Sequence, residues 1–216
     1  MIRFSLFAAA SAFALVACST APASVETSDG PSQLTQTESG FTLAMKTVDQ
    51  LVEAGNTQTA IDRLTQLTGD PTLTQEQLAE ALLRRGELRS SDGGYDLMGA
   101  IDDFEEIINT APTTPSYAAA VPMLETARGK AMSLNFLLEQ PETTRFEKFN
   151  ILMQLGQHEE AIDLMINNDL TPDNETLIAM YQIGYLCEGD ELTGRLYEAT
   201  EPDGTPHELR FCDFGK

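Results

Sequence analysis

The sequence is poor in basic residues, and this shortage argues against several classes of function. Its 216 residues include 13 lysines and arginines against 34 aspartates and glutamates, for a formal net charge of −21. Clustered basic side chains bind phosphate groups, so we do not expect a nucleic-acid-binding protein. The charge also argues against adhesion of a protein face to anionic lipid. The acidity indicates a solvated surface, with a docking face for a basic partner as the alternative.

Histidine, cysteine and the common catalytic motifs are also scarce. The chain has two histidines, three cysteines and no tryptophan. It contains no His-Glu-x-x-His or Cys-x-x-Cys stretch, so we expect no zinc site. A phosphate-binding loop and a Gly-x-Ser-x-Gly elbow are missing too. We expect His158 to have a packing role, and His207 lies in the C-terminal tail. The sequence therefore predicts neither an enzyme nor a bound metal or cofactor.

Two groups of carboxylates could be mistaken for catalytic or calcium sites. The segment from Asp169 to Glu175 lacks the glycine and the spacing of a calcium loop. The other group surrounds Phe104 and Ile107 on a predicted helix, where we expect a solvated outer face. Its members are Asp102, Asp103, Glu105 and Glu106.

One apolar run is present, at the N-terminus. Met1 to Ala17 reads MIRFSLFAAASAFALVA, with a single cation at Arg3. It is too short to span a bilayer as a stable anchor, so residues 1–17 are predicted to be a secretory signal peptide. Cys18 follows Leu15-Val16-Ala17, which resembles the lipobox of bacterial lipoproteins. The alternative is an ordinary signal peptide with an incidental cysteine.

The lipoprotein resemblance implies a lipid anchor. Cys18 would carry a diacylglyceryl thioether, and after removal of the signal its new amine would be acylated, for example with palmitate. Ser19 after the cysteine fits export to the outer membrane. Residues 18–40 are rich in Ser, Thr, Pro and Gly, so they are predicted to form a disordered tether that spans roughly 25–30 Å.

From Phe41 onward the apolar residues follow a helical period. The clearest stretch, Ala79 to Pro112, has two amphipathic patterns around a Ser/Asp/Gly turn. Ala100, Phe104 and Ile107 stand at i, i+4 and i+7, so the alanine admits a partner helix and the phenylalanine fills the space above it. This stretch resembles a tetratricopeptide repeat (TPR), a helix-turn-helix unit of about 34 residues.

Further units are predicted around the same small-then-large spacing. Ala131 and Gly194 mark two units mainly by register, and Pro122 predicts a kink or break in the helix that contains it. The predicted fold class is all-α, an α-solenoid of stacked TPR-like units over residues 41–200, with an unrelated helical bundle as the alternative. The repeat-packing residues are Ala60, Leu64, Ala100, Phe104, Ala161 and Met165.

The C-terminal tail, residues 201–216, is predicted to pack on the last repeat. Cys187 and Cys212 are an even pair in an exported chain, so we predict a disulfide between them, with two free thiols as the alternative. The tail would cover the open end of the array through Leu209, Phe211 and Phe214.

The TPR resemblance implies a scaffold that holds a partner segment in a concave groove. Arg84 and Arg85 either bind a carboxylate of the partner or pair with nearby glutamates. The candidate groove residues lie on the first helix of each unit: Lys46, Gln50, Arg84, Arg85, Asn150 and Gln154.

The sequence thus predicts a lipid-anchored periplasmic adaptor, on the periplasmic face of the outer membrane, that binds another cell-envelope protein or peptide. One alternative is a structural envelope-assembly factor that acts by self-association. Another is an accessory subunit of a peptidoglycan-modifying enzyme.

Overall fold

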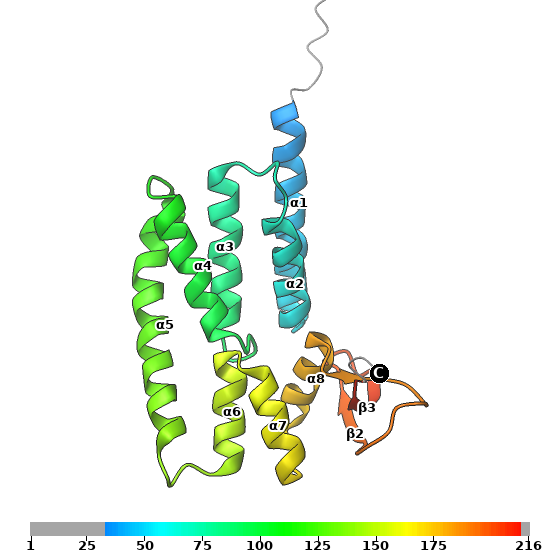
Figure 1. Ribbon diagram of the computed structural model, residues 1–216. Coiled ribbons are helices and arrows are strands. Elements are labelled where there is room, and N and C mark those ends of the chain that lie inside the picture. Colours follow the sequence, from blue (N-terminus) through cyan, green and yellow to red (C-terminus); the bar gives the residue numbers. More distant parts are fainter. Residues whose placement is uncertain (1–32, 213–216) are drawn as a thin grey trace, which may run out of the picture.

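The computed structural model describes residues 33–212, with side chains from residue 40 (Figure 1). The predicted signal peptide, the lipidated Cys18, most of the tether and Phe214 lie outside the described residues. The described chain is mostly helical, in agreement with the predicted all-α class, and it ends in a small sheet. Its helices are α1 (Gln33–Glu53), α2 (Thr57–Thr68), α3 (Gln75–Ser90), α4 (Leu97–Thr110), α5 (Pro115–Glu139), α6 (Arg145–Leu155), α7 (His158–Asn168) and α8 (Asn174–Ile183).

Local sequence sets several helix ends. Thr74 and Thr144 each form a reciprocal capping box with the residue three positions on, Gln77 and Glu147, as their spacing predicts. At the other end of α6, Gly156 adopts φ of +83°, a left-handed conformation that costs glycine little. None of the helices within residues 33–212 is both long enough and apolar enough to cross a bilayer.

One predicted boundary is wrong, and the helix break expected as one of two alternatives at Pro122 is absent. The first helix begins at Gln33, so the last part of the predicted tether is helical. Pro31 is the last proline before it, and Gln, Leu and Glu after Pro31 all favour helix. Helix α5 runs through Pro122 without a break. Pro122 has no backbone N–H, so the carbonyl of Ala118 lacks its usual helical hydrogen bond. Both residues are exposed, and water can therefore bond to that carbonyl instead.

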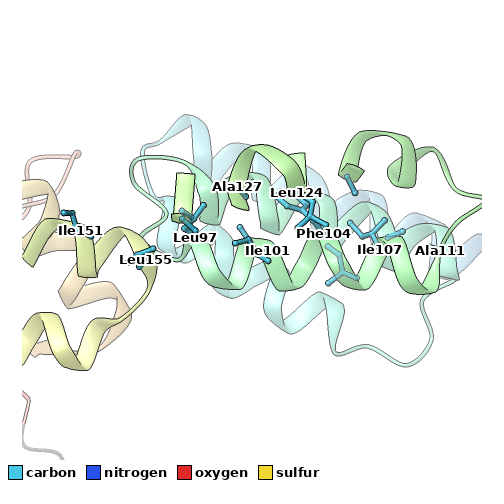
Figure 2. Close-up of a cluster of buried hydrophobic side chains, with 14 residues drawn as sticks. Leu97, Ile101, Phe104, Ile107, Ala111, Leu124, Ala127, Ile151 and Leu155 are labelled. Atoms are coloured by element: carbon cyan, nitrogen blue, oxygen red, sulfur yellow. The ribbon is translucent and has the colours of Figure 1, made fainter. Parts of the chain in front are cut away.

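The core has three parts that follow one another along the chain. Helices α1–α3 share the first cluster, which contains Val48 and Leu64. The second joins α3, α4 and α5 and reaches α6 through Leu155 (Figure 2). The third joins α6, α7, α8 and the strands, and its centre includes Phe149 and Met165. All six predicted repeat-packing residues are buried in these clusters.

Phe104 shows why α3 and α4 approach closely. It is 1% exposed, and a Cβ built on Gly86 of α3 would lie 2.6 Å from its Cε1 atom. The missing side chain at Gly86 therefore creates the space that the ring fills. Ala100, one turn earlier on α4, is fully buried as well.

The second helix of the last predicted unit is wrong, because the chain forms strands after α8. Strands β1 (Leu186–Cys187), β2 (Tyr197–Thr200) and β3 (Pro206–Phe211) make an antiparallel sheet in the order β1-β3-β2. Gly194, placed in a helix by register, has φ of +101° in the loop before β2. Burial alternates along β2 with the period of a strand, and Gly204 (φ +93°) turns the chain into β3.

The predicted disulfide is present and fastens this sheet. Cys187 in β1 is bonded to Cys212, directly after β3, with 5.0 Å between the Cα atoms. Leu209 is fully buried and Phe211 is partly buried in the third cluster, so this part of the tail does cover the end of the helical array.

Candidate binding cleft

Among the described residues, the hollows beside Pro122, Tyr95, Asn150 and Tyr185 each contain at most one predicted groove residue. Lys46 and Gln50 are exposed on α1. Arg84 is paired with Asp49 at 3.0 Å and with Glu87 at 3.2 Å. Gln154 is partly buried on α6. Asn150 lines a separate hollow of about 400 Å³, together with Leu137 of α5 and Ile151 of α6. The predicted groove residues of α1 and α3 do not line this hollow.

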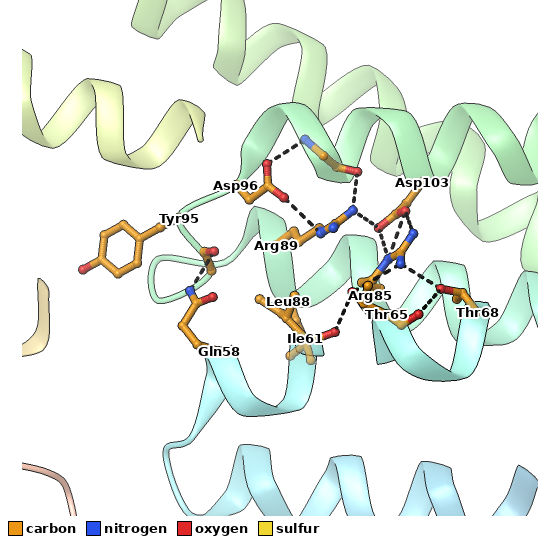
Figure 3. A network of polar contacts seen from close by, with 12 residues as sticks. Gln58, Ile61, Thr65, Thr68, Arg85, Leu88, Arg89, Tyr95, Asp96 and Asp103 are labelled. Atoms are coloured by element: carbon orange, nitrogen blue, oxygen red, sulfur yellow. Dashed lines mark hydrogen bonds and ion pairs between the residues drawn. The ribbon is translucent and has the colours of Figure 1, made fainter. Parts of the chain in front are cut away.

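Arg85 is engaged inside the protein (Figure 3). Its guanidinium lies 2.6 Å from Asp103, and Arg89 donates to the other carboxylate oxygen at 3.0 Å. Arg85 also bonds the hydroxyls of Thr65 and Thr68, which ties α2 to this pair. The network occupies the donors with which Arg85 would bind a partner's carboxylate.

Asp103 corrects the prediction of a solvated acidic face. Its side chain is 2% exposed, whereas Asp102 and Glu106 are exposed. Asp103 faces α3, where Arg85 and Arg89 stand four residues apart and therefore share one helix face. The four-residue spacing of these two arginines is the feature of the sequence that could have predicted a buried carboxylate facing α3.

The two histidines have structural partners. His158, at the start of α7, lies with Nε2 2.7 Å from the backbone oxygen of Tyr95, and its ring meets Tyr185 edge-on at 5.7 Å. His207 of β3 lies with Nδ1 2.8 Å from Glu188, and its ring packs 4.7 Å from that of Tyr181.

A cleft of about 530 Å³ lies where α2 and the α3–α4 loop meet α8 and the end of β2. We call it the junction cleft, because its walls come from both the first and the last parts of the chain. No residue of the predicted groove lines it. Its lining includes Gln58, Tyr95, Glu175, Ile178, Gln182 and Glu201.

Hydrogen bonds fix the N-terminal wall of the junction cleft. Gln58 is buried, and its amide donates to the carbonyls of Gly93 and Gly94, each at 2.9 Å. Tyr95 has φ of +48°, uncommon for a residue with a side chain, and its backbone oxygen meets His158. This tight turn places the Tyr95 ring against the third core cluster, in the C-terminal part of the described chain.

The C-terminal wall is fixed in the same way. The hydroxyl of Tyr95 lies 3.2 Å from that of Thr176 on α8, so it joins the two walls. Asn174 exchanges two hydrogen bonds with the backbone of Thr200, at 2.8 and 2.7 Å, which holds β2 against α8. The junction cleft is therefore preorganised by contacts between distant segments.

The junction cleft suits a cation with an apolar stem. Among the described residues that line it are Glu175 and Glu201 but no lysine or arginine. Burial raises the pKa of Tyr95, and the charges of Glu175, Asp173 and Asp92 raise it further, so the phenol stays neutral at physiological pH. A lysine or arginine side chain could place its charge near these carboxylates and its methylenes on Ile178.

Within residues 33–212, no group of three or more His, Cys, Asp or Glu side chains is arranged to hold a metal ion. The chain matches no protein-family model, no curated protein and no solved structure.

Proposed function

We propose that this protein is a lipid-anchored adaptor of a bacterial cell envelope that binds a basic segment of another envelope protein in its junction cleft. Cys18 would carry the lipid at the periplasmic face of the outer membrane, and the residues after it would act as a tether. The observation that carries the proposal is the junction cleft, which has a volume of about 530 Å³, is built from residues 55–95 and 174–202, and includes Glu175 and Glu201 in its lining.

The contacts between helices support a TPR-like stack. Besides neighbours in sequence, α3 contacts α5 and α4 contacts α6, and α2 contacts α8 much farther along the chain. Contacts between helices two positions apart, as in the first two pairs, are expected when helix pairs stack in one direction. The full burial of Ala60, Ala100 and Ala161 supports the same interpretation.

The charge of the chain supports a basic partner. At a net charge of −21, the protein attracts a cationic segment and repels acidic ones over the distances at which proteins first meet. The partly closed cleft would strengthen that attraction locally, since charges shielded from water interact more strongly. In this proposal the acidic surface selects the basic partner, and Tyr95 and Ile178 contact the apolar part of the partner's lysine or arginine side chain.

The test is to crosslink cells that express the wild type, purify the protein from membranes and identify what is bound. Glu175→Gln with Glu201→Gln should reduce recovery of the partner roughly tenfold, because both carboxylates among the lining residues are neutralised. Glu201 also lies 3.2 Å from Nε2 of His207, so circular dichroism checks that the double variant stays folded. Asp102→Asn with Glu106→Gln, which removes two charges from exposed sites on α4, is the matched control and should leave recovery unchanged.

Cys18→Ala tests the anchor in the same experiment. The variant should leave the membrane fraction and lose the partner. Equal recovery of the partner with the double glutamine variant would exclude the junction cleft. Recovery of the protein alone in a soluble fraction, with or without Cys18, would exclude the lipoprotein.

A further inference from the structure

Helix α5 carries apolar residues on two opposite faces. Its inner face packs against α3 and α4 through small residues, Ala120, Ala127 and Ala131, with Leu124 among them. Its outer face carries larger ones: Met132 is 74% exposed and Phe136 is 62% exposed. A helix that is apolar on both faces is normally covered on both.

The outer face has the spacing of a helix-pairing seam. Gly129, Met132 and Phe136 follow one another at three and four residues, the interval of a coiled coil. A Cβ built on Gly129 would meet nothing within 4 Å, so the described chain leaves this position open. A partner helix could approach closely at Gly129 and pack on Met132 and Phe136. We call these three residues the α5 seam.

The charge around the α5 seam favours a second copy of this chain. Residues 115–155 carry four basic side chains, Arg128, Lys130, Arg145 and Lys148. They also carry four acidic ones, Glu125, Glu139, Glu142 and Glu147, so their net charge is zero and the other residues carry the whole −21. Two copies that meet elsewhere bring acidic surface against acidic surface, whereas this segment avoids the repulsion.

We propose that two copies of the protein associate through the α5 seam, with their α5 helices antiparallel. A two-fold axis near residue 134 places Met132 opposite Phe136 of the second copy, so the large side chains interlock. The same register brings Arg128 close to Glu139 of the second copy, twice by symmetry. Arg128 already bonds Glu105 at 2.7 Å, but its side chain is 56% exposed and keeps free donors. This proposal does not depend on the junction cleft.

Sedimentation velocity of the full chain in density-matched detergent tests the association. The wild type should form a concentration-dependent dimer, and Phe136→Glu should weaken it by roughly 100-fold, because each copy then places a charge in the seam. Leu43→Glu, at an equally exposed leucine on α1, is the matched control and should remain dimeric. Circular dichroism checks that each variant stays helical.

A charge exchange tests the register. Glu139→Arg should weaken the dimer roughly tenfold, because it faces Arg128 of the second copy, and Arg128→Glu added to it should restore the affinity. A wild type that is monomeric at every concentration overturns the proposal, whether lipid or the chain's own N-terminus covers the seam. A dimer that Phe136→Glu leaves intact, or a double variant that does not recover, overturns it as well.

Discussion

Helices α1–α5 and the C-terminal unit, residues 145–212, are stabilised by different means. In α1–α5, helices of 12 to 25 residues pack through small residues such as Gly86, and a buried carboxylate, Asp103, joins α3 to α4. In the C-terminal unit the helices have only 10 or 11 residues and a disulfide closes the sheet. Short helices contribute little to stability by themselves, so the smaller unit needs a covalent link in addition to its hydrophobic cluster, whereas packing and charge hold the larger one.

The largest expected effect comes from Asp103→Asn. Arg85 and Arg89 would keep their charges without the carboxylate that faces both. The free energy of unfolding should fall by about 3–5 kcal/mol, measured by urea denaturation. Asp102→Asn on the same helix should change it by less than about 0.5 kcal/mol because Asp102 is exposed. If the two variants lowered the free energy of unfolding equally, the buried ion pair at Asp103 would not contribute to stability.

Cys187→Ser with Cys212→Ser should destabilise mainly the C-terminal unit. The bond spans 25 residues, for which the loop-entropy estimate is about 3–4 kcal/mol. Hydrogen exchange followed by mass spectrometry should show faster exchange in β1, β3 and α8, with α3 and α4 unchanged. Uniformly faster exchange would mean that the two regions unfold as one unit.

Gly86→Ala tests the close packing of α3 on α4. The new Cβ would collide with the ring of Phe104, so we expect a loss of about 1–3 kcal/mol in thermal or urea denaturation. Gly40→Ala is the matched control, since Gly40 is also inside a helix, α1, but is exposed, and a Cβ there would meet nothing within 4 Å. It should stabilise the protein by about 0.5–1 kcal/mol. A stabilising Gly86→Ala would contradict the packing described for Phe104.

Asp96→Asn should give the smallest effect, visible as a pH dependence. Burial raises the pKa of Asp96, and the nearby Arg89 only partly offsets this. The folded state therefore binds a proton more tightly than the unfolded state, and the contribution of Asp96 to stability increases as pH falls through its folded pKa. Relative to Asp96→Asn, the wild type should gain stability between pH 7 and pH 4 in urea denaturation. No relative gain would show that Arg89 compensates the burial fully.

The sequence predicts the local structure of the helical region well. Capping boxes at Thr74 and Thr144 mark helix starts, and the small-then-large spacing identifies buried positions such as Ala100 and Phe104. Each of these sequence patterns spans only one or two helical turns, so the local structure that it predicts does not depend on contacts with the rest of the chain. The disulfide could also be predicted, since only two cysteines remained once Cys18 was assigned to lipid.

The sheet and the junction cleft could not be predicted in this way. The register of the repeats placed Gly194 in a helix, although the alternation along β2 and the Asp203-Gly204 turn indicate a hairpin. The junction cleft depends on contacts over long separations. Tyr95 and Thr176, for example, are 81 residues apart, and no short motif encodes that pair.

The most direct test of the adaptor places a photo-crosslinking amino acid at one of two glutamines and compares them in living cells. Gln182 lines the junction cleft, whereas Gln50 belongs to the groove predicted from the sequence. The account predicts a crosslink from position 182 to a lysine- or arginine-rich segment of one envelope protein, and none from position 50. A partner captured from position 50 but not from position 182 would contradict it.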